Sequence, residues 1–141
     1  MSGIYHWVTD ELWKSFPHAT STGTWQLHLI AASYVVDLAT HRSFTSPTIE
    51  TADILFSETV VPIVAASVSP PHSGAMSLPP VTYTAPSSAT DAAYVILTLD
   101  LGTYTRNRMV WYGDAATGLP ITFDGSDRTV SGISLSIANK A

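Results

Sequence analysis

The C-terminal third of the chain, residues 91–137, reads DAAYVILTLDLGTYTRNRMVWYGDAATGLPITFDGSDRTVSGISLSI. It holds four short apolar or alternating segments separated by turn residues, at 93–99, 107–113, 119–125 and 130–137. The last segment alternates apolar and small polar residues, which is typical of a strand with one face on a core. We therefore predict four β-strands here and an all-β protein.

Weaker strand signals precede this block. Residues 25–31 alternate so that Trp25 and Leu29 share one face, while His28 lies on the other face. We expect that strand to be half-buried, with His28 facing solvent or an interface and not binding a metal.

The middle of the chain is rich in proline and in β-branched residues. Residues 52–56 fit a strand or a short helix, and residues 59–68 predict one strand in which Pro62 marks an edge or a bulge. Residues 69–80 contain two Pro-Pro pairs and predict a loop, and residues 81–84 predict a further strand. Roughly six to eight short strands with turns between them predict an antiparallel β-sandwich or a small barrel, with its body at residues 24–141.

Residues 1–23 differ from this body, and we expect them to form an arm or a short helix. Thr9 is a candidate N-cap, and Pro17 ends the helical pattern. A helix this short is marginal by itself, so it packs either on its own domain or on a neighbouring subunit. The segment carries four large aromatic residues: Tyr5, Trp7, Trp13 and Phe16.

The composition fits one domain with little surface charge. The chain has 141 residues, of which 45% are hydrophobic and only 12% are charged, against a usual charged fraction of about 25%. Either copies of the chain or a partner cover part of the surface, or the surface is a neutral, Ser/Thr-rich one.

Charge and hydropathy exclude several classes of partner. The formal net charge is −5 and the six basic residues are scattered, which argues against a nucleic-acid surface. The N-terminus lacks the features of a signal peptide, and no apolar run is long enough for a transmembrane helix, so we expect no membrane association. The chain contains no cysteine, so neither disulfides nor a cysteine-based metal site contribute.

The residues offer little support for catalysis or metal binding. The five histidines lack ligand spacing, and Asp37 with His41, although four residues apart, fits a polar loop better than a catalytic pair. Asp114, Asp124 and Asp127 could be calcium ligands, but residues 124–127 lack the EF-hand pattern and fit a turn better. We therefore expect no cofactor, no metal and no enzymatic activity.

Aromatic residues allow a second hypothesis, that of carbohydrate binding. Trp25, Trp111 and Tyr112 could stack on sugar rings if they were exposed. Alternation places Trp111 and Tyr112 on opposite faces of a strand, so that one of them is expected to serve the core.

The segment from Val110 to Ser136 resembles a recurring small virion protein of tailed bacteriophages. The resemblance is carried by an acidic-Thr-Gly turn, Gly118-Leu119-Pro120 followed by Ile121-Thr122, and a Gly-Ser-Asp step before the last strand. Residues 25–44 match a second family segment, an alternating strand followed by Ser33-Tyr34, Thr40-His41 and Phe44. The family's Gly-rich middle is replaced here by the Pro-rich sequence around residues 70–80.

The resemblance implies a structural particle component without catalytic residues. We expect a capsid decoration or cement protein in the virion, assembled in the host cytoplasm, that contacts the major capsid protein and copies of itself. The alternatives are a tail, neck or baseplate protein and a carbohydrate-binding adhesin module. The residues expected to make partner contacts are Tyr5, Trp7, Trp13, Phe16, Pro70, Pro71, Pro79 and Pro80.

Overall fold

The computed structural model describes residues 2–4, 24–35, 54–67, 72–100, 108–114 and 116–140. Every regular element in these ranges is a β-strand, and every strand pair is antiparallel. The predicted all-β class is therefore confirmed. The helix expected near Thr9 lies outside the described residues, and no helix long and apolar enough to cross a membrane occurs within them.

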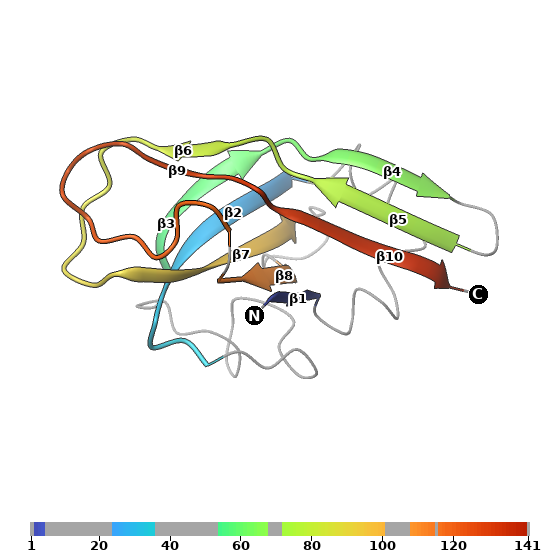
Figure 1. Cartoon of the computed structure of the whole chain (residues 1–141), viewed down its shortest axis with the longest axis horizontal. Coiled ribbons are helices and arrows are strands. Elements are labelled where there is room, and N and C mark those ends of the chain that lie inside the picture. Colours follow the sequence, from blue (N-terminus) through green and yellow to red (C-terminus); the bar gives the residue numbers. More distant parts are fainter. Residues whose placement is uncertain are drawn as a thin grey trace.

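The largest sheet has five strands in the order β1-β8-β7-β2-β3 (Figure 1). At its centre, β2 pairs with β7 from Thr24 opposite Asp100 to Ala31 opposite Ala92. β1 comes from the predicted N-terminal segment and pairs with β8 at one edge. The five strands are β1 (Ser2–Ile4), β2 (Thr24–Ala31), β3 (Ile54–Val60), β7 (Ala92–Asp100) and β8 (Arg108–Gly113).

Two smaller sheets lie along one side of the large one, as the upper layer of Figure 1. One has the order β10-β5-β4, and the other pairs β6 with β9. A backbone bond from Leu78 N to Ile133 O (3.0 Å) joins them, so β5–β6 and β9–β10 run as one long interrupted ribbon. The strands are β4 (Ile63–Ser67), β5 (His72–Ser77), β6 (Val81–Tyr83), β9 (Arg128–Val130) and β10 (Ser134–Lys140).

Proline and glycine divide the ribbon. Pro79 and Pro80 follow β5, and proline cannot donate to a ladder. Opposite them, Gly132 has a φ of 74°, which turns the chain between β9 and β10. The single strand predicted over residues 130–137 is therefore wrong, because Gly132 splits it into strands of two different sheets.

Three further strand predictions need correction. Residues 69–80 were expected to form a loop, but β5 lies within them and is the central strand of its sheet. Residues 59–68 are two strands, because Pro62 interrupts them between β3 and β4. Residues 119–125 form no strand, since Ile121 makes only an isolated bridge to Ala92 and Gly125 turns the chain with a φ of 83°.

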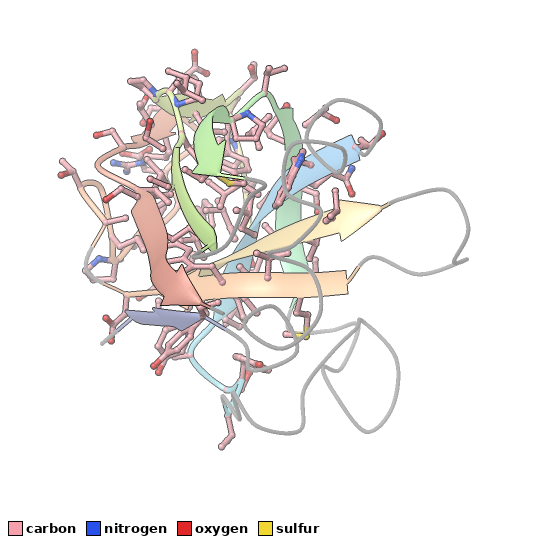
Figure 2. All side chains as sticks on the ribbon, turned by 90° about the vertical axis from the view of Figure 1, so that its right-hand side faces the viewer. Carbon is pink, nitrogen blue, oxygen red and sulfur yellow. The ribbon has the colours of Figure 1, made fainter. Side chains whose placement is uncertain are left out.

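The core fills the space between the large sheet and the ribbon, where Figure 2 shows crowded side chains. Leu27, Leu97 and Trp111 contribute from the large sheet. The ribbon contributes Met76, Leu78, Tyr83, Val130, Ile133 and Leu135. The opposite face of the large sheet is buried as well, for example at Ile30 and Ile96. Burial on both faces explains why residues 94–99 read as a nearly continuous apolar run.

Candidate partner-binding surface

An open groove lies where β3 ends and β6 begins. It has a volume of about 300 Å³. One wall comes from the end of β3 and the segment that follows it, and the other comes from the Pro79-Pro80 segment and β6. We call it the groove surface, and its residues are Glu58, Thr59, Val60, Val61, Pro79, Pro80, Val81 and Thr82.

One large apolar side chain is exposed in the lining of this groove, and a second is exposed two residues beyond it. Val61 is 78% exposed, and Ile63, two residues further along the chain, is 68% exposed. Both flank Pro62, and Val61 and Pro62 lie between β3 and β4, outside either ladder. Apolar side chains exposed at neighbouring positions next to a groove are typical of a surface that a partner covers.

The groove surface carries almost no charge. Glu58 is the one ionisable residue that lines it, and the chain has no Asp, Glu, Lys or Arg between Glu58 and Asp91. Such a surface is suited to contacts made by apolar burial and shape, not to steering by charge.

The structure places two of the eight predicted contact residues at this groove. Pro79 and Pro80 are exposed and line it. The other six, Tyr5, Trp7, Trp13, Phe16, Pro70 and Pro71, lie outside the described residues and stay predictions.

Val61 and Ile63 were missed by the sequence reasoning. The β-branched run around them predicts a strand, and a strand position by itself does not indicate exposure. The signal that could have located them is Pro62, because a proline inside an apolar run indicates an edge or a break where side chains reach solvent.

His28 belongs to a buried polar network. It is 2% exposed, so the expectation that it faces solvent is wrong. Its Nδ1 lies 2.6 Å from Ser57 Oγ on β3, and its Nε2 lies 2.7 Å from Thr98 Oγ1 on β7. The imidazole therefore connects three adjacent strands.

Burial lowers the pKa of His28 to about 4. At neutral pH the ring is uncharged, so one nitrogen donates a hydrogen bond and the other accepts one. An imidazole with this pKa is a weak base, and both of its nitrogens are bonded to hydroxyl groups. The network therefore favours a role in fixing the sheet over a role in general-base catalysis.

The three aromatic residues of the carbohydrate hypothesis are buried. Trp25, Trp111 and Tyr112 all belong to the core cluster. Trp111 also packs over Gly113, where an added Cβ would collide with the indole. None of the three presents an open ring face, so sugar stacking on these residues is not supported.

Asp124 and Asp127, two of the three calcium candidates, organise a turn. Asp124 Oδ1 accepts hydrogen bonds from the backbone and side chain of Ser126, and its Oδ2 pairs with Arg128 at 3.0 Å. The bonds from Ser126, with a smaller effect of Arg128, lower the pKa of Asp124. Asp127 accepts a bond from Ala85 N (2.8 Å). Within the described ranges, no group of three or more His, Cys, Asp or Glu residues is arranged to hold a metal ion.

The remaining candidates can be placed only in part. Asp37 and His41 lie outside the described residues, as do His6 and His18. His72 begins β5, where it pairs with Lys140.

Comparisons with family models, curated proteins and solved structures found no match to this chain.

Proposed function

We propose that this protein is a structural component of a tailed-phage particle, namely a capsid decoration or cement protein on the outer shell. The phage assignment is supported by the sequence resemblance at residues 25–44 and 110–136. Within that resemblance, the Gly-Leu-Pro step has a structural reason. Gly118 has a φ of 107°, and a Cβ there would collide with the carbonyl oxygen of Thr129.

The observation that carries the proposal is the groove surface. It combines an exposed Val61, exposed prolines and a segment without charged side chains, in a chain with only 12% charged residues. A cement protein attaches by burying such surface across junctions between capsid subunits. Binding only to the assembled shell then stabilises the shell by mass action.

We also infer that the two layers form a β-sandwich. The ribbon and the large sheet contribute to one core cluster, in which Met76 and Leu135 accompany Leu27 and Leu97. Among the described strands, β1 and β3 end the large sheet and β4 and β10 end the three-stranded one, so no described strand closes either layer. Open edges favour a sandwich over the alternative of a closed barrel.

Further contacts are assigned to the N-terminal aromatic residues and to the first proline pair. Tyr5, Trp7, Trp13 and Phe16 would extend the contact as an arm or a short helix, and Pro70 with Pro71 would add a second point of attachment. The partners are the major capsid protein and copies of this chain.

The groove surface is tested by replacing Val61 with aspartate. Burying a carboxylate at the contact is unfavourable, so Val61→Asp should weaken attachment to particles at least about tenfold. Particles of the phage that carries this gene are purified with each variant, and bound protein is quantified against the major capsid protein.

Val35→Asp is the matched control. Val35 is 80% exposed and follows the C-terminal end of β2. Val61 lies near the N-terminal end of β2, because the preceding residue Val60 is paired with Trp25. Equal attachment of Val61→Asp, Val35→Asp and wild type would contradict the role of the groove surface.

Copy number separates the alternatives within the particle. Hundreds of copies per particle support shell decoration, whereas roughly six to a few dozen indicate a neck, tail or baseplate position, as expected for symmetric rings. Absence from the particle rejects the virion proposal and leaves the adhesin alternative.

A further inference from the structure

β4 is the edge strand of the three-stranded sheet. Its five residues pair with β5 from Ile63 opposite Ser77 to Ser67 opposite Ser73. Among the described strands, β5 is its one pairing partner, because β10 lies on the far side of β5. The second edge of β4 is therefore not used by any strand that the structure describes.

Within the described residues, this edge carries neither a charge nor a bulge, two features that usually prevent strand-to-strand association. Natural edge strands are protected by charged residues, bulges or inward-pointing charges. β4 reads Ile-Val-Ala-Ala-Ser without a charge, and its pairing with β5 is regular along its whole length. Ile63 at its start is 68% exposed. Pro62 protects only the position before the strand.

We propose that β4 pairs with β4 of a second copy of this chain, antiparallel and about a two-fold axis. Centred on Ala65, this pairing places Ile63 opposite Ser67 and Val64 opposite Ala66 of the partner, so that all five residues are paired. The inference rests on the proposed function for its biological role, since it defines how neighbouring copies on a shell join.

Charge favours a second copy as the occupant of this edge. A net charge of −5 adds a repulsion between copies of the chain. The segment between Glu58 and Asp91, which contains β4, is the longest part of the sequence without charged side chains. Two β4 strands can therefore approach without opposing like charges, and a two-fold axis lets one strand serve both sides of the contact.

The oligomeric state of the purified full-length chain tests the proposal. We expect a concentration-dependent dimer in sedimentation velocity, and a dimer weakened at least about tenfold in Ile63→Lys, because a charge on an edge strand opposes pairing. Val35→Lys, at a valine that is 80% exposed and follows the end of β2, should associate as the wild type does. A monomeric wild type, or a dimer unaffected by Ile63→Lys, would overturn the inference.

A cysteine crosslink gives a second readout that does not depend on weakening the dimer. The chain has no cysteine, so Ala65→Cys introduces one thiol. Residues directly opposite in an antiparallel pair have Cα atoms about 4.5–5.5 Å apart, within the range of a disulfide. Ala65→Cys should form a covalent dimer under mild oxidation, whereas Val35→Cys at the same concentration should not. Equal crosslinking of the two variants would reject pairing at β4.

The two proposals fail separately. If the chain binds particles through Val61 but stays monomeric and Ala65→Cys does not crosslink, the β4 inference fails and the particle role stands. If the dimer and the crosslink form but purified particles lack the protein, β4 pairing stands and the particle role fails.

Discussion

At the scale of single residues, the burial of His28 has the largest consequence for the stability of the fold. A sequence that alternates Trp25, Leu27 and Leu29 with Gln26 and His28 predicts one dry face and one wet face. The structure instead buries His28 beside Thr98 and connects it to Ser57. The histidine is thus a buried neutral group whose protonation opposes folding.

Stability should therefore fall in mild acid. The pKa of His28 is lowered from 6.5 in the unfolded chain to about 4 in the folded protein. Between these pH values His28 binds a proton in the unfolded chain but not in the folded protein. The contribution of His28 to the free energy of unfolding is therefore largest above about pH 6.5, declines as the pH falls and levels off below about pH 4. The total loss is on the order of 3 kcal/mol.

Urea unfolding of the wild type and His28→Gln between pH 7 and pH 4 measures this loss. Carboxylates titrate in both proteins, so the difference between the two pH profiles isolates the histidine. His28→Gln should be less stable at pH 7 and should lose less stability on acidification. Parallel profiles would reject this role for His28.

At the scale of elements, turns determine where the strands end. After β8 the chain folds back on itself through β9, with Thr117 and Ser131 exchanging two backbone hydrogen bonds at the base of the loop 117–131. Gly118 is needed there for two reasons, because its φ is 107° and because the Thr129 carbonyl oxygen occupies the space of a Cβ. Gly125 has a φ of 83° but open space around it.

Replacing these two glycines by alanine should destabilise the protein to different extents. Gly118→Ala adds backbone strain and a collision with main-chain atoms, so it should lower the free energy of unfolding by about 2–4 kcal/mol. Gly125→Ala adds strain alone and should cost about 1 kcal/mol. Chemical denaturation of both variants checks the order, and equal losses would mean that the close approach to Thr129 has no energetic weight.

At the scale of the whole molecule, contacts between the layers connect residues far apart in the sequence. Tyr83 on β6 donates a hydrogen bond from its hydroxyl to the carbonyl oxygen of Leu27 on β2, at 2.7 Å. Burial, with a smaller effect of the Glu58 carboxylate, raises the pKa of Tyr83, so the phenol stays protonated and remains a donor. The bond joins the ribbon to the centre of the large sheet.

Removing that hydroxyl should loosen the connection between the layers. Tyr83→Phe keeps the ring in the core but deletes the donor, which should lower the free energy of unfolding by about 1 kcal/mol. Tyr94→Phe, at a half-buried tyrosine on β7, is the control and should change stability less. Hydrogen exchange at β6 amides offers a local readout, and an unchanged exchange rate together with unchanged stability would contradict the role of this bond.

Local signals in the sequence predict the all-β class and the approximate positions of β2, β6, β7 and β8, because strand periodicity and β-branched content depend on neighbouring residues alone. They also predict that Pro79 and Pro80 lie outside a ladder, since proline has no N–H to donate. The folded chain was needed to see that β1 pairs with β8, that Gly132 divides β9 from β10, and that β5 is a central strand. Those features depend on pairing between segments far apart in the sequence, which local composition does not indicate. The same holds for the burial of His28, because the position of a strand within its sheet decides which side chains remain in water.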